Sequence, residues 1–93
     1  MISYASIDRI EGKYAVCELE FVDIIESKKI NFEDKETEMV DIPLTELEIC
    51  AREAKEGDIL IVKHNNGKEI IVLSIDYAEK HRRIKKLREI MEQ

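Results

Sequence analysis

The side chains best suited to metal binding are two cysteines, Cys17 and Cys50, and two histidines, His64 and His81. Structural zinc sites draw their ligands from short C-x-x-C or H-x-x-x-H pairs, and no two of these four residues have such a spacing. We therefore expect no metal site, with both cysteines as reduced core thiols and both histidines exposed. A Cys17–Cys50 disulfide has no support, because a secreted chain of this size that relied on disulfides would usually carry more cysteines.

Nucleophilic and acid–base catalysis have equally little support. No serine stands in a nucleophile-elbow context. Asp8, Glu11 and Glu18 fall on neighbouring strand-like segments, but such carboxylates usually form a solvated face rather than an acid–base pair. Glycine occurs only at positions 12, 57 and 67, which excludes a Gly-rich phosphate-binding loop. The sequence therefore predicts a protein that is not an enzyme and that binds no cofactor.

The charge of the chain is unevenly distributed. Residues 1–79 carry 9 Lys and Arg against 19 Asp and Glu, whereas residues 80–93 carry 6 against 2. A basic tail on an acidic body either lies against that body or presents its charge to an acidic partner. The candidate basic patch consists of Lys80, Arg82, Arg83, Lys85 and Lys86, continued by Arg88.

Five strand-like segments lie within residues 1–75. Apolar side chains alternate with polar ones in the second, as in a half-buried antiparallel strand. The last two are apolar on both faces, a pattern typical of strands covered on both sides. The sequence predicts a mainly β fold with some α: a small five-stranded antiparallel barrel, SH3-like or OB-like, over residues 1–75, followed by a C-terminal helix. The predicted strands are Ile2–Ile10, Lys13–Phe21, Met39–Ile42, Ile59–His64 and Lys68–Ile75.

Turn residues separate these segments. Glu11-Gly12 predicts the first hairpin turn, where glycine can adopt a positive φ. Asn66-Gly67 predicts a type I′ turn, in which both central residues need a positive φ. Pro43 is expected to end the third strand because proline cannot donate a hydrogen bond to the next strand. Residues 44–49 then predict a short helical turn.

Residues 76–92 predict a basic amphipathic helix. Asp76 is the expected N-cap, and Glu79 three residues later would complete a capping box. Because the last two strands need a second cover, we expect the helix to pack on their outer face. The alternative is that the helix projects away and packs on another chain as a dimer. Its apolar face consists of Tyr77, Ile84, Leu87, Ile90 and Met91.

Residues 22–38 form the least regular part of the chain. Their second half is almost entirely charged and is expected to be exposed, so we interpret this segment as an insertion within a single domain of residues 1–93. Four apolar side chains in this charged context are candidates for contact with a partner protein, although they could equally extend a hairpin of the chain itself: Ile24, Ile25, Ile30 and Phe32.

Four stretches of the chain together resemble a family of short bacterial proteins catalogued as the domain of unknown function number 3006. They are IDRIEGKYAVCELE, the VDIP of residues 40–43, AKEGDIL and the tail EKHRRIKKLREIM. The resemblance covers nearly the whole chain except residues 22–38, where such members usually have a short turn. It implies a small β-barrel with a trailing helix and no established activity. It also suggests a partner, because members tend to occur beside competence-type metallo-β-lactamase-fold proteins.

These observations favour a non-enzymatic interaction or adaptor module that contacts a protein partner through its helix or through residues 22–38. The alternative is a small barrel that binds nucleic acid through the basic helix. The acidic body and the few aromatic residues weigh against it, since single-stranded nucleic acid needs exposed rings on a basic surface. The N-terminus lacks a signal-peptide pattern and the longest apolar stretches are too short to span a bilayer, so we expect a cytoplasmic protein without membrane contact.

Overall fold

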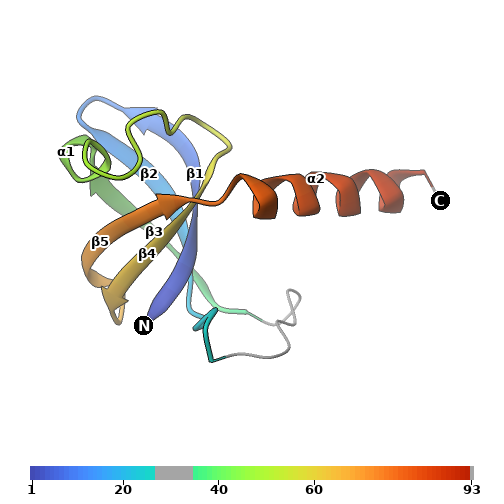
Figure 1. Cartoon of the computed structure of the whole chain (residues 1–93), viewed down its shortest axis with the longest axis horizontal. Coiled ribbons are helices and arrows are strands. Elements are labelled where there is room, and N and C mark those ends of the chain that lie inside the picture. Colours follow the sequence, from blue (N-terminus) through green and yellow to red (C-terminus); the bar gives the residue numbers. More distant parts are fainter. Residues whose placement is uncertain (27–34, 93) are drawn as a thin grey trace.

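The computed structural model describes residues 1–26 and 35–92 of the chain. Five strands form one antiparallel sheet in the order β3-β2-β1-β4-β5, which curls into a half-barrel (Figure 1). The predicted fold class, a small antiparallel β structure with a C-terminal helix, is therefore confirmed. The elements are β1 (Ile2–Glu11), β2 (Tyr14–Glu20), β3 (Thr37–Pro43), α1 (Leu44–Leu47), β4 (Ile59–Asn65), β5 (Lys68–Ile75) and α2 (Tyr77–Met91).

Two hairpins, β1–β2 and β4–β5, are joined through β1 and β4, which pair from Ile2↔Lys63 to Ser6↔Ile59. In the β4–β5 hairpin, Asn66 and Gly67 have φ values of 51° and 84°, as the predicted type I′ turn requires. The β1–β2 turn lies one residue later than expected, because Glu11 still pairs with Tyr14 and only the two residues between them form the turn.

The two edge strands, β3 and β5, face each other across an open seam. A groove of about 440 Å³ lies there, lined by Val40 and Ile42 of β3 and by Ile70 of β5 among others. Pro43 ends β3, as predicted. Within β5, Glu69 has a φ of 53° and lies in a bulge, since Lys63 pairs with Ile71 and Asn65 with Lys68. Proline and bulges both prevent edge strands from pairing, which accounts for the open seam.

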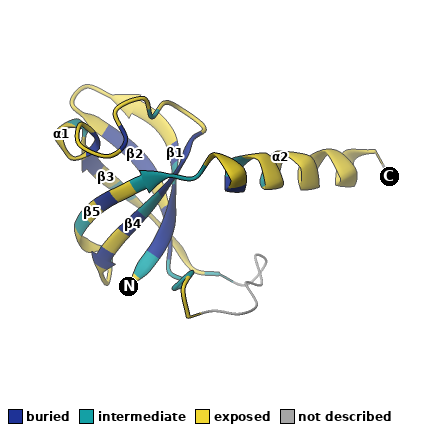
Figure 2. Cartoon of the chain, in the orientation of Figure 1, coloured by how far each residue is buried: buried dark blue, intermediate teal, exposed yellow. Residues whose placement is uncertain are grey.

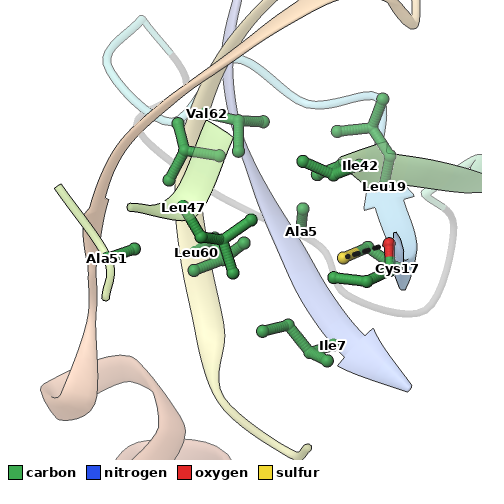
Figure 3. Close-up of a cluster of buried hydrophobic side chains, with 11 residues drawn as sticks. Ala5, Ile7, Cys17, Leu19, Ile42, Leu47, Ala51, Leu60 and Val62 are labelled. Atoms are coloured by element: carbon green, nitrogen blue, oxygen red, sulfur yellow. Dashed lines mark hydrogen bonds between the residues drawn. The ribbon is translucent and has the colours of Figure 1, made fainter. Parts of the chain in front are cut away.

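The hydrophobic core fills the hollow of the half-barrel (Figure 3). Alternate residues of the strands point inward, and Leu47 of α1 and Ala51 of the following loop contribute to the same cluster. The predicted helical turn after Pro43 is confirmed by α1. Burial is concentrated in the sheet, whereas α2 is almost entirely exposed beyond its first turns (Figure 2). The core side chains with at most 2% exposure include Ala5, Ile7, Cys17, Leu19, Ile42, Leu60 and Val62.

Candidate interaction site

The start of α2 is fixed to the sheet by hydrogen bonds. Asp76 is the N-cap, and its Oδ1 accepts the backbone N–H of Glu79 at 2.9 Å. The hydroxyl of Tyr4 on β1 donates to Asp76 Oδ2 at 3.3 Å. The predicted capping box is nevertheless incomplete: the Asp76 N–H donates to the Ile59 carbonyl at 2.8 Å, so the Glu79 carboxylate turns instead to two arginines.

A cluster of charged side chains joins α2 to β2. The Arg83 guanidinium donates to both oxygens of Glu20, at 2.7 Å (Nη1–Oε2) and 3.0 Å (Nη2–Oε1), while its Nε donates to Glu79 Oε1 at 3.1 Å. Lys35 donates to Glu20 and Arg82 to Glu79, each at 2.8 Å. The two carboxylate side chains are only 5% and 7% exposed. Because a buried carboxylate is costly unless it is paired, each of them is held by two cations.

The contacts of Glu20 keep its carboxylate ionised. Burial by itself would raise the pKa of Glu20, but the hydrogen bonds from Arg83 and Lys35 more than offset it and lower the pKa below its usual value. The guanidinium of Arg83 also lies 5.2 Å from the centre of the Tyr4 ring, in cation–π contact. Burial, helped by the charges of Glu79 and Asp76, raises the pKa of Tyr4. The helix is therefore tied to the sheet by a forked contact, in which the two Nη atoms of Arg83 bind the two oxygens of Glu20. This contact fixes the relative orientation of the two side chains, which a single charge–charge contact would not do.

A second ion pair ties α2 to the segment that leads into β4. Lys80 Nζ donates to Asp58 Oδ1 at 2.8 Å, and Asp58 Oδ2 accepts the Lys55 backbone N–H at 3.0 Å. The Asp58 side chain is 1% exposed. Burial would raise the pKa of Asp58, but these two hydrogen bonds lower it. Lys80 and Arg83 thus hold one side of the first two helical turns against the half-barrel.

Three members of the candidate basic patch therefore contact carboxylates of the same chain. Lys80 pairs with Asp58, and Arg82 and Arg83 pair with the Glu79 and Glu20 carboxylates. Lys85 and Lys86 lie on the exposed part of α2. Within the described residues, the basic run serves in part to attach the helix.

The expectation that α2 covers the outer face of β4 and β5 is wrong. The helix runs away from the sheet, and Ile71 and Leu73 of β5 stay 52% and 39% exposed (Figure 1). The physical reason is the set of charged contacts at Glu79, Lys80 and Arg83, which fix the helix direction at its base. The apolar stripe of α2, which we define as Ile84, Leu87, Ile90 and Met91, is 42%, 58%, 60% and 77% exposed, respectively.

The second candidate contact surface, in residues 22–38, is described only in part. The Ile24 N–H donates to the Ile2 carbonyl at 2.9 Å and its side chain is half-buried, which leaves Ile25, at 70% exposure, as the apolar side chain presented to solvent. Asp23 shapes this turn through its Oδ1, which accepts the Ile25 N–H at 2.9 Å. The other two candidates, at positions 30 and 32, lie outside the described residues.

His64 is buried, contrary to the sequence-based expectation. Its Nδ1 accepts the Gly67 N–H at 2.9 Å, which leaves Nε2 to carry the proton and to donate to Ser3 Oγ at 2.9 Å. The Ser3 hydroxyl donates in turn to the Val22 carbonyl at 2.9 Å. Burial lowers the pKa of His64, and the nearby N-terminal amine lowers it further. The neutral imidazole thus connects the β4–β5 turn, β1 and the end of β2.

The cysteines differ in exposure. Cys17 is buried in the core, as predicted, where burial and then the charge of Asp41 raise its pKa to about 12. Cys50 is an exposed free thiol, so the expectation of a second core cysteine is wrong. It lies between two core residues, Leu47 and Ala51, but on the side of this segment that faces solvent. In the described parts of the chain, no three His, Cys, Asp or Glu side chains gather as ligands for a metal ion.

The buried carboxylates at positions 20, 58 and 79 were not identified from the sequence. Glu20 stands on the polar face of a predicted strand and Asp58 in a Gly-Asp turn, where a carboxylate is ordinarily solvated. Their cationic partners are distant in sequence: Arg83 lies 63 residues after Glu20. The only available signal is the excess of cations in residues 80–93 of a chain whose remaining part is acidic.

Comparisons with protein-family models, with curated proteins and with solved structures give no match. The resemblance to the domain of unknown function number 3006 therefore stays a prediction. None of the helices in residues 1–26 and 35–92 combines the length and the apolar character needed to cross a membrane.

Proposed function

We propose that this protein is a non-enzymatic interaction module that presents α2 to a protein partner. One observation supports this most strongly: the base of the helix is firmly attached to the half-barrel while its apolar stripe is exposed. Each stripe residue has more than 40% of its surface in contact with water, from 42% at Ile84 to 77% at Met91. Exposed apolar surface rimmed by polar side chains is typical of interaction sites.

The attachment at Arg83 bears directly on binding. An arm that swung freely would lose orientational freedom when a partner docked, and that loss would weaken binding. The forked contact between Arg83 and Glu20 and the Lys80–Asp58 pair limit this freedom before the partner arrives. The half-barrel thus serves as a base that sets the direction of the helix.

The proposal can be tested by affinity capture from the native host. The bait would be compared with a variant in which the four stripe residues are replaced by serine. A matched control would carry serine at Ile49 and Ile71, which are also exposed apolar residues, at 88% and 52% exposure, but lie outside α2. We expect a partner that the wild type and the control both capture and that the stripe variant does not. Equal capture by all three would contradict the proposal.

Residues 22–38 are a further candidate surface for the same partner, with Ile25 as its exposed apolar residue. An Ile25→Ser bait in the same experiment measures its contribution. The family resemblance suggests a metallo-β-lactamase-fold protein as a partner to look for among the captured proteins.

Nucleic-acid binding is the second candidate function, supported by the net positive charge of residues 80–93. Against it, Lys80, Arg82 and Arg83 already contact carboxylates of the chain. A gel shift at low salt with single-stranded and duplex DNA and RNA tests it, since phosphate contacts would make binding steeply salt-dependent. Absence of a shift at micromolar protein would exclude it.

A further inference from the structure

The open seam between β3 and β5 leaves the edge of β3 without a neighbouring strand. In the described residues β3 pairs only with β2, and β5 only with β4. On such an edge every second residue turns its backbone N–H and C=O away from the sheet. Pro43 is the last residue of β3 and the bulge at Glu69 lies at the start of β5, so both interrupt only strand ends. Residues 37–42 therefore keep an extended edge that can pair with another chain.

Two grooves follow this edge. One, of about 440 Å³, is lined by Val40 and Ile42 of β3 and by Ile70 of β5 among others. The other, of about 400 Å³, is lined by Phe21 and by Thr37 at the beginning of β3. Val40, Ile70 and Phe21 are only partly buried against the core, so they leave apolar surface along the seam. Together the grooves extend along the full length of β3.

The side chains around these grooves carry negative charge. Among the described residues, no Lys or Arg lines either groove, and the neighbouring Lys35 and Lys68 do not reach into them. The carboxylates that line the two grooves form no ion pair in residues 1–26 and 35–92, where the ion pairs involve other carboxylates. An occupant that brings cations would therefore meet carboxylates that have no cation of their own. These carboxylates are Glu36, Glu38, Asp41, Glu46 and Glu69.

The free edge and the negative charge together select the occupant. A helix bonds its own backbone groups and has none to offer to β3, which argues against α2 of a second copy in spite of its basic residues. A second copy of β3 would bring the same carboxylates, and nucleic acid would bring phosphates, so both would be repelled. An extended segment with Lys or Arg satisfies both features, because its backbone pairs with the edge and its cations face the carboxylates.

We infer that the seam beside β3 binds an extended basic segment of a partner protein as an added strand. Val or Ile side chains of this segment lie on Val40 and Ile70. Its Lys or Arg side chains face Asp41, Glu46 and Glu69. The seam shares no residue with the apolar stripe of α2, so this inference goes beyond the proposed function and does not rest on it.

The probe is a fluorescent peptide of about eight residues in which Val alternates with Lys, long enough to cover β3. One control peptide replaces Lys by Glu. Two others carry N-methyl groups on every second amide, at odd positions in one and at even positions in the other, so that each loses the N–H donors of one edge but keeps its charge. Fluorescence anisotropy at physiological ionic strength should show that the Val/Lys peptide binds. The Glu peptide and one of the two N-methyl peptides should bind at least about tenfold more weakly.

The N-methyl controls separate strand pairing from a general attraction of cations to an acidic protein, and protein variants locate the site. Asp41→Lys combined with Glu46→Lys should weaken binding at least about tenfold. The matched control is Glu89→Lys combined with Glu92→Lys, which makes the same change of charge at exposed positions at the end of α2 and should change affinity by less than about twofold. Thermal melts check that every variant keeps the fold.

Hydrogen exchange of the wild type locates the peptide without any substitution. The Val/Lys peptide should slow amide exchange in residues 37–42, because the outward N–H groups of β3 become hydrogen-bonded.

Any of four results would overturn the inference: the Val/Lys peptide does not bind, the Glu peptide binds equally well, both N-methyl peptides bind like the parent, or the seam variant binds like the wild type. Exchange that slows only in α2 would also overturn it, since the peptide would then lie on the helix. Capture of a partner through the apolar stripe is measured separately, so the proposed function stands or falls independently of these results.

Discussion

Arg83 on α2 holds Glu20 on β2 by two parallel hydrogen bonds, at 2.7 and 3.0 Å, across 63 residues of sequence. This fork sets the direction of the helix. We expect Arg83→Met to destabilise the protein by about 1–3 kcal/mol, less than for a fully buried pair because Lys35 stays on Glu20 and Arg83 is partly exposed. Arg83→Lys keeps the charge but not the fork and should recover only part of the loss. Chemical denaturation of both variants, in a double-mutant cycle with Glu20→Gln, measures the coupling free energy between Arg83 and Glu20. A coupling free energy of zero would contradict the role of this contact in holding the helix.

The type I′ turn makes a comparison of two glycines informative. At Gly67 φ is +84°, and an added Cβ would lie 3.3 Å from Phe21 Cζ, whereas at Gly12 φ is +57° and no atom lies within 4 Å. Gly67→Ala should therefore lower stability by about 1 kcal/mol or more, and Gly12→Ala by less. Thermal midpoints of the two variants test this difference. An equal loss of stability in both would show that the Phe21 side chain moves aside without destabilising the fold.

The position of α2 reverses the expectation for Leu87. Because 58% of the Leu87 surface is exposed, the substitution Leu87→Ala should change the free energy of unfolding by no more than about 0.5 kcal/mol. Leu60, which is fully buried, is the control, and Leu60→Ala should cost about 2–5 kcal/mol. A chain that ends at residue 85 should likewise keep its cooperative melt, since the contacts at Glu79, Lys80 and Arg83 remain. A large loss in Leu87→Ala would mean that the helix folds back on the sheet.

Buried His64 predicts sensitivity to mild acid. Its pKa lies below the ordinary value of 6.5 in the folded chain. Above about pH 6.5 both the folded and the unfolded chain hold it neutral, so its contribution is complete. As the pH falls further, the unfolded chain takes up a proton that the folded chain resists, and stability falls by up to ~1.4 kcal/mol per pH unit. Denaturation curves between about pH 7.5 and 5.5 should show this slope, and His64→Gln should flatten it while His81→Gln should not.

The two cysteines should react at very different rates. Cys50 is exposed, whereas Cys17 is buried and burial raises its thiol pKa to about 12. A thiol reagent at neutral pH should modify one cysteine per folded chain and both in denaturant. Cys50→Ser should abolish the fast reaction, and rapid modification of this variant would show that the core opens readily.

The strands could be predicted because their signals are local. The alternating residues of β2, the Asn66-Gly67 turn and Pro43 each determine the backbone within a few residues of themselves. The burial of His64 escaped prediction because it depends on Ser3, far away in sequence, which joins it only when β1 pairs with β4. The direction of α2 escaped prediction for the same reason: its apolar spacing suggested a cover for the sheet, but the contact with Glu20 decides where the helix points.

The pairing of β1 with β4 has a consequence for how the chain folds. Each hairpin closes a loop of a few residues, and such loops form within microseconds. The ladder from Ile2↔Lys63 to Ser6↔Ile59 closes a loop of more than fifty residues and must overcome a much larger entropy. We expect the encounter of the two preformed hairpins to limit the folding rate. The helix then docks last, once the pairing of β1 with β4 has placed both Glu20 and Asp58 within reach of Arg83 and Lys80.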